Sequence, residues 1–289
     1  MQITVWDVVA VAIKAILYAA TLCAAGGVFF LIYDGPRISF DQRRRIRRWV
    51  GLCILVALLT SMVRIVILAG SLGEGIADSA MVRMVLEAGE GRATGVRIAG
   101  LLLTGTAAFA GRRGAIAALP GALLSATSFA WIGHVWAANH GGLSIALLSL
   151  HLIGVAFWLG ALVPLLLIVR DGDLLRIARS AARFGNVAVI VVLVLIAAGA
   201  TLVSILLTGV SDLWTNAYGR TVTVKIGCVA CLLSVAAFNK LHLTPRLLAG
   251  DSRAVSDLSR SIRVEMLVGS LILTVTAILT TLMGPPALE

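Results

Sequence analysis

The stretch "LSIALLSLHLIGVAFWLGALVPLLLIV", residues 143–169, contains no Asp, Glu, Lys or Arg and one histidine, His151. A helix of roughly 20 mostly apolar residues is long enough to cross the hydrocarbon core of a bilayer. The stretch therefore predicts a transmembrane helix that carries an imidazole. The rest of the chain agrees, because 60% of its residues are hydrophobic and 13% are charged. A soluble protein of this length does not bury that much apolar surface.

Eight apolar segments of this kind are predicted. They fall at residues 7–33, 49–70, 93–110, 115–137, 143–169, 184–208, 219–239 and 263–283. The fold class is therefore all-α, a polytopic membrane bundle, and the short loops predict a single transmembrane domain over residues 1–289. The first segment is expected to stay on the mature chain, because residues 1–7 lack the basic region of a signal peptide.

The basic residues predict how the bundle lies in the membrane. The loops after the first, third, fifth and seventh segments are rich in Arg and Lys, whereas the intervening loops are neutral or acidic. Short basic loops stay on the cytoplasmic side, so both termini are expected in the periplasm of a bacterial inner membrane. The formal charge of +10 is explained by these loops, which contact anionic headgroups of the lipid bilayer. Nucleic acid is therefore not an expected partner.

Three of the four histidines lie close together in the sequence, at His134, His140 and His151. His134 is predicted near the outer end of the fourth segment and His140 in the outer loop. His151 is predicted roughly 12 Å below the outer boundary, at about 1.5 Å of rise per residue. Taken singly, each is more often a hydrogen-bonding or surface group. Taken together, they favour an ion path or metal site, because ionisable groups in spans are costly and imidazole is a common metal ligand.

Two further patterns carry a family resemblance. "LHLIGVAFWLGAL", with His151, Trp158 and Gly160, resembles the His, six residues, Trp, any residue, Gly signature of the bacterial copper resistance D (CopD) family. "YGRTVTVKIGCVACLLSVAAFNKLHLTPRL", residues 218–247, is similar to that family's penultimate helix and exit. The resemblance implies an inner-membrane protein that takes copper from a periplasmic carrier of the CopC type and moves it toward the cytoplasm.

The chain offers ligands for both oxidation states of copper, since imidazole suits Cu(II) and sulfur suits Cu(I). The candidate metal ligands are His134, His140, His151, Met62, Met81, Met84, Cys228 and Cys231, and the candidate site-lining residues are Trp158, Lys225 and Arg64. An alternative interpretation is that the sulfur residues only pack or anchor a helix. None of the four cysteines lies in an outer loop, so no extracellular disulfide is indicated.

Several cations oppose a simple copper channel. Lys14, Arg64, Arg97 and Lys225 map to the outer half of the spans, while Asp7, Glu87, Glu90 and Asp212 are expected at the surface. Two unit charges at about 4 Å repel by roughly 4 kcal/mol at an effective dielectric of about 20. Some of these cations are expected to snorkel to the headgroups.

An anionic ligand is the other way to neutralise the outer cations. It leads to an alternative function, a b-type haem held by His134 and His151 with its propionates on Arg64, Arg97 or Lys225. Such a protein would carry out redox chemistry in the membrane.

No enzyme activity is expected from the sequence. It shows no acid, base and nucleophile set of a hydrolase and no glycine-rich phosphate loop. Pumping driven by ATP is therefore not predicted for this chain alone.

Overall fold

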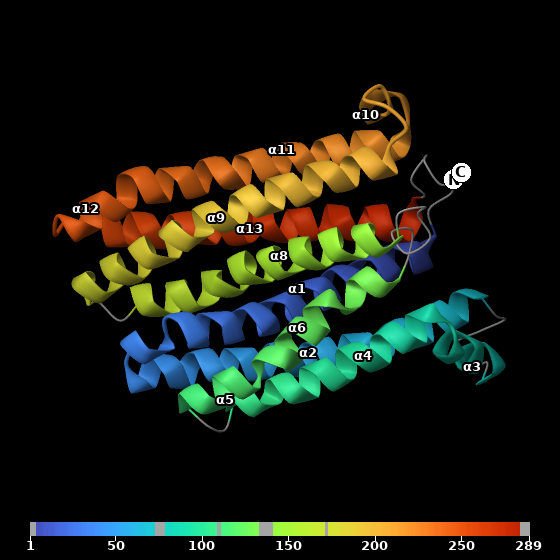
Figure 1. Ribbon diagram of the computed structural model, residues 1–289, viewed down its shortest axis with the longest axis horizontal. Helices are drawn as coiled ribbons and strands as arrows, with labels where there is room; N and C mark the ends of the chain where they lie inside the picture. Colours follow the sequence, from blue (N-terminus) through green and yellow to red (C-terminus); the bar gives the residue numbers. More distant parts are fainter. Residues whose placement is uncertain (1–3, 73–78, 109–110, 133–140, 171–172, 284–289) are drawn as a thin grey trace.

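The computed structural model describes residues 4–72, 79–108, 111–132, 141–170 and 173–283. Within these ranges most residues are helical and none lies in a strand. The long helices run side by side along the length of the molecule (Figure 1). The prediction of an all-α polytopic bundle is confirmed.

The helices follow one another along the chain with short connections. The α-helices are α1 (Val5–Tyr33), α2 (Phe40–Leu72), α3 (Ser79–Glu87), α4 (Gly89–Thr104), α5 (Gly111–Ala117), α6 (Leu119–Thr127), α8 (Gly141–Val169), α9 (Leu174–Leu206), α10 (Asp212–Thr215), α11 (Ala217–Phe238), α12 (Thr244–Leu248) and α13 (Arg253–Leu282). Short 3₁₀ turns are η1 (Gly35–Arg37), η2 (Gly105–Ala108) and η3 (Ser128–Trp131), and a π-helical turn, η4 (Asn239–Leu243), joins α11 to α12.

In the described part of the chain, seven helical stretches are long and apolar enough to cross a membrane. α4 is shorter, with 16 residues, and continues as η2 while packing along α2 and α6. α1 begins and α13 ends at the same end of the bundle (Figure 1), where Lys14 Nζ donates to the Thr280 carbonyl at 2.7 Å. α4 with η2 covers most of the third predicted span, at residues 93–110, but it is not among these seven stretches.

Three long helices begin earlier than the predicted spans at residues 49, 184 and 263. α2 begins at Phe40, α9 at Leu174 and α13 at Arg253. Hydropathy marks the part of a helix that lies in hydrocarbon, but Arg and Leu are good helix formers and continue the helix beyond it. Many of the basic residues predicted in loops therefore lie on the first turns of long helices.

The fourth predicted span, residues 115–137, is not one continuous helix. α5 ends at Ala117 and α6 begins at Leu119, with Pro120 in its first turn. Proline lacks an N–H and fits the first turn of a helix but not its interior. The break therefore falls where Pro120 requires it, and residues 133–137 of the predicted span lie outside the described ranges.

α1 lies inside the bundle and packs against α2, α4, α6, α8 and α13. Its closest approach to α8 is at two glycines: a Cβ added to Gly26 would lie 1.8 Å from the Ala156 carbonyl oxygen, and one added to Gly160 would lie 2.4 Å from Gly26 Cα. Small residues let helix backbones approach closely in membranes. This contact fixes the position of α8, which carries His151 and Trp158.

The end of α1 is tied to α9 by a buried carboxylate. Asp34 follows the last residue of α1 and is fully buried. Its oxygens accept hydrogen bonds from Ser180 Oγ at 2.7 Å and from Arg183 Nε at 2.8 Å. A buried charge is tolerated when it is paired and hydrogen-bonded, so this network holds α1 and α9 together at one end of the bundle.

Candidate functional site

His151 lies on α8 with its ring against α9. A Cβ added to Gly199 of α9 would lie 3.7 Å from His151 Cε1 and 3.8 Å from Nδ1. The Leu195 carbonyl is close enough to interact with the ring, but Nδ1 is buried and no hydrogen bond of good geometry reaches it. The imidazole therefore has an enclosed nitrogen that is free to bind a ligand.

Lys225, half-buried on α11, is the charged group that acts electrostatically on His151. The positive charge of Lys225 raises the electrostatic potential at the His151 ring. A cation placed at His151 Nδ1 would be repelled by the Lys225 ammonium, and this repulsion is stronger away from bulk water.

The structure does not collect the other candidate ligands around His151. His134 and His140 lie outside the described residues. Met62 on α2 and Met84 on α3 are exposed, Cys228 and Cys231 on α11 are half-buried and exposed, and Met81 packs against a small cluster of Ile65, Ala69 and Val85. In the ranges that the structure describes, no three His, Cys, Asp or Glu side chains are grouped to hold a metal ion.

The outer cations are paired more closely than expected. Arg64 of α2 donates from Nε to Glu90 Oε1 at 2.7 Å, and both side chains are mostly buried. The expectation that Glu90 lies at the surface is therefore wrong. Glu90 is in the first turn of α4, and the packing of α4 against α2 turns its carboxylate inward.

Arg97 and Lys14 do not snorkel. Arg97 of α4 is fully enclosed, its Nε donates to Ser128 Oγ at 3.1 Å, and its guanidinium lies 4.1 Å from the centre of the Phe129 ring. Lys14 of α1 is 7% exposed. Both side chains point between helices because α1, α4 and η3 pack together there. The expectation that such cations reach the lipid headgroups is therefore wrong for Arg97 and Lys14.

A second polar cluster joins α8, α11 and α13. Glu265 of α13 is buried, with 3% exposure. Its Oε2 accepts a hydrogen bond from Trp158 Nε1 at 3.2 Å, and its Oε1 accepts one from Asn239 Nδ2 at 2.5 Å. Trp158 is also held edge-on by Phe184 of α9 at 6.2 Å. Sequence reasoning selected Trp158 as site-lining but did not find its carboxylate partner.

Glu265 was missed because the sequence does not show which face of the last helix is buried. Residue 265 lies just after the predicted start of the last span at residue 263, where a carboxylate is expected at the surface. α13 packs against α8 and α11, and this packing encloses the Glu265 side chain. Buried ionisable residues inside a span are functional candidates. The π-helical turn that begins at Asn239 adds to this, because such turns are frequent at functional sites.

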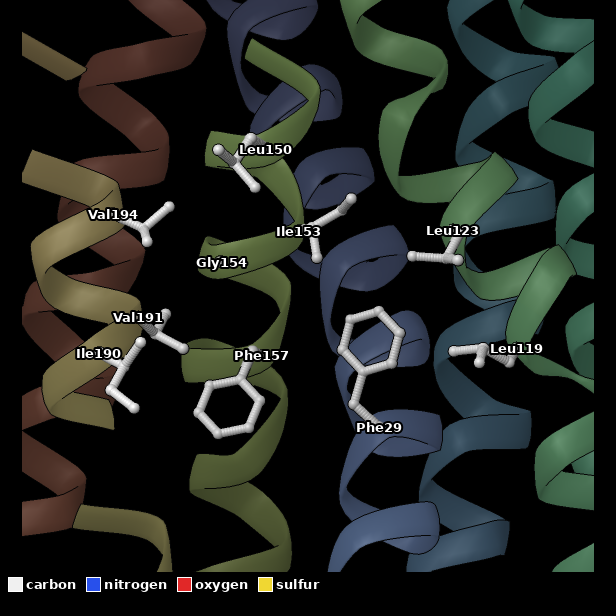
Figure 2. Close-up of a pocket in the computed structure, with 10 residues that line it drawn as sticks. All are labelled: Phe29, Leu119, Leu123, Leu150, Ile153, Gly154, Phe157, Ile190, Val191 and Val194. Atoms are coloured by element: carbon white, nitrogen blue, oxygen red, sulfur yellow. The ribbon is translucent and has the colours of Figure 1, made fainter. Parts of the chain in front are cut away.

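Figure 2 shows a cavity of about 400 Å³ beside the His151 segment of α8. Its wall consists of apolar side chains from α1, α6, α8 and α9, among them Phe29, Leu123, Phe157 and Val194. Such a wall offers no ligand to a metal ion. The cavity therefore fits an apolar chain better than a copper ion.

Comparison with known proteins identifies the family. The sequence model described as copper resistance protein D matches residues 178–279, and the model described as the copper resistance protein D-like N-terminal domain matches residues 5–145. The chain belongs to the copper resistance protein D family. No curated protein and no solved structure matches the chain.

As a CopD family member, the protein is a multi-pass membrane protein of copper resistance. The two matched ranges contain Arg97, Glu90, Asn239 and Glu265, while His151 and Trp158 lie between the ranges. The Trp158–Glu265 hydrogen bond therefore links the segment between the two matches to the second match.

The hydrogen bonds of Glu265 with Trp158 and Asn239 lead to a stability prediction for this CopD protein. Glu265→Leu strands the Trp158 and Asn239 donors, at about 1–3 kcal/mol for each unsatisfied buried group. Glu265→Gln keeps an acceptor for Trp158, and its amide can donate to Asn239 Oδ1, which has no partner. We expect thermal unfolding in detergent to show the Leu variant clearly less stable than the Gln variant.

Glu87→Leu is the matched control, because Glu87 is exposed and pairs with its helix neighbour Arg83 at 2.8 Å. Its unfolding temperature should stay near that of the wild type. Equal stability of the Leu and Gln variants at position 265 would show that the two hydrogen bonds do not hold the cluster together.

Proposed function

We propose that this protein moves copper ions across the membrane, from the periplasm toward the cytoplasm, by transient binding at His151. The observation that carries the proposal is the buried Nδ1 of His151, to which the described residues offer no hydrogen bond of good geometry, in a chain of the copper resistance protein D family. Neutral imidazole binds copper, and an ionisable group inside a span marks an ion path. Copper is the substrate in this proposal. The positive charge of Lys225 keeps the binding of copper at His151 weak and reversible.

His134 and His140 are proposed to capture copper at the outer mouth and pass it to His151. Met81 and Met84 belong to α3, at the bundle end where α1 begins (Figure 1), so their sulfurs are proposed as accessory ligands for Cu(I). Delivery by a periplasmic carrier of the CopC type is proposed from the family resemblance. Met62 and Cys231 are exposed, so we do not place them in the proposed path.

The distribution of cations supports the direction. The first turns of α2 and α9 and the α12–α13 connection lie at the bundle end opposite α3 and α10 (Figure 1). These segments contain clusters of Arg residues, as cytoplasmic ends do: Arg43, Arg44, Arg45, Arg47 and Arg48 in α2, Arg176, Arg179 and Arg183 in α9, and Arg246 and Arg253 beside the connection. Both chain termini are then proposed to be periplasmic.

Copper flux into sealed vesicles tests the proposal. Purified protein is reconstituted in liposomes, copper is added outside as Cu(II) or, with a reductant, as Cu(I), and the copper inside is measured by mass spectrometry. We expect faster accumulation than in protein-free liposomes for at least one of the two ions. If neither ion accumulates faster than in protein-free liposomes, the transport proposal is overturned.

The haem alternative stands as a second candidate because Arg97 keeps Nη1 and Nη2 without partners, as a propionate-binding residue would before haem binds. It predicts a Soret band that shifts on reduction in the purified protein. A colourless protein that transports copper decides against it.

A further inference from the structure

Arg97 is a buried cation with an incomplete set of partners. The side chain is fully enclosed, Nε is bound to Ser128 Oγ, and the Phe129 ring covers one face of the guanidinium. Nη1 and Nη2 are also buried, and within the described residues neither has a hydrogen-bond partner. An enclosed charge without partners is strongly unfavourable, so these two nitrogens require a ligand that accepts hydrogen bonds.

The charges around Arg97 indicate that the ligand is negative. Lys14 and Arg64 lie close enough to interact electrostatically with Arg97, and Glu90 is the carboxylate that acts on all three. Glu90 is already bound by Arg64. Among the described residues, the Arg97 guanidinium is therefore left without a carboxylate of its own. A water molecule would satisfy the hydrogen bonds of Arg97 but would leave its charge uncompensated, whereas an anion satisfies both.

We propose that the Arg97 guanidinium binds a small monovalent anion, chloride, in an enclosed site between α1, α2, α4 and η3. A monatomic anion needs the least room beside a side chain that is wholly enclosed. One N–H group on Nη1 and one on Nη2 can both donate to a single anion. The anion neutralises the outer half of the bundle, where a positive field would otherwise repel an entering cation. The proposal does not depend on the transport of copper.

The response of thermal stability to chloride tests the site. The purified protein is unfolded in detergent at constant ionic strength while sodium gluconate is replaced by sodium chloride. A ligand that binds the folded state raises its stability with concentration. We expect a saturable rise in the unfolding temperature of the wild type and none in Arg97→Met.

Arg83→Met is the matched control, because Arg83 is also a cation on the outer side but its side chain is 82% exposed. This variant should keep the chloride response of the wild type. A wild type that does not respond to chloride, or an Arg97→Met variant that responds equally, would overturn the proposal.

A second measurement remains decisive if Arg97→Met does not fold. Wild-type crystals soaked in bromide should show an anomalous peak within hydrogen-bonding distance of Arg97 Nη1 or Nη2. Absence of that peak would reject a halide at this position. A Soret band in the wild type that is lost in Arg97→Met would assign the guanidinium to a haem propionate and would equally reject chloride.

Discussion

Replacement of His151 by alanine is expected to abolish copper uptake while the protein is still made and folded. The imidazole provides the buried, unpartnered nitrogen on which the proposed path depends. Loss of a residue that only hydrogen-bonds to a metal ligand lowers metal affinity by about 10- to 100-fold. Loss of the ligand itself should therefore reduce copper flux by at least about tenfold. Copper accumulation in proteoliposomes and copper retained per chain both measure it.

The structural cost of His151→Ala is expected to be small, because within the described residues Nδ1 makes no hydrogen bond of good geometry and the Leu195 carbonyl only lies near the ring. His242→Ala is the matched control: His242 is exposed on the π-helical turn, where its ring stacks on Phe238 at 5.2 Å. That variant should transport copper as the wild type does. Preserved uptake in His151→Ala would remove His151 from the path, and an equal loss in both variants would show that the effect is not specific.

Replacement of Gly26 by alanine is expected to cause a large loss of stability. The added Cβ would lie 1.8 Å from the Ala156 carbonyl oxygen and 2.8 Å from Gly160 Cα. Both contacts are with backbone, which cannot rotate away as a side chain can. α1 and α8 must therefore separate, and the cost should exceed the about 1–3 kcal/mol of ordinary overpacking. Thermal unfolding in detergent and the yield of monodisperse protein measure the loss.

Gly51→Ala provides the comparison for Gly26→Ala. A Cβ at Gly51 of α2 meets no atom within 4 Å. The same substitution should be neutral there or stabilise the protein by about 0.5–1 kcal/mol, because alanine restricts the unfolded chain and favours a helix. Similar unfolding temperatures for the two variants would mean that the α1–α8 contact does not determine the stability of the bundle.

The elements that were predicted well are those whose signal lies within one helix. Residues 143–169 contain an uninterrupted apolar run, so the span was placed within two residues of α8 at its start and at its end. Helix starts were predicted less well. Residues 40–48 are too polar to be recognised as a span by hydropathy, but they belong to the helix α2. The break at Pro120 was visible in the sequence as a proline, but an apolar run hides it when hydropathy is averaged.

The candidate site was predicted only in part. His151 and Trp158 were selected from the sequence, and both lie inside the bundle. Their partners were not found, because Trp158 meets Glu265 across 107 residues and Arg64 meets Glu90 across 26 residues. No local pattern joins such pairs.

The amino-acid sequence by itself determined that the chain is a membrane-spanning helical bundle and that it resembles the copper resistance D family, because hydropathy and motifs are properties of consecutive residues. The tertiary structure alone decided that Glu90 faces Arg64, that Arg97 is enclosed without a full set of partners, and that Trp158 donates to Glu265. The physical reason is that a helix in a bilayer satisfies its backbone internally. Its rotation about its own axis, which decides which side chains meet, is therefore set by contacts with other helices, such as the one at Gly26.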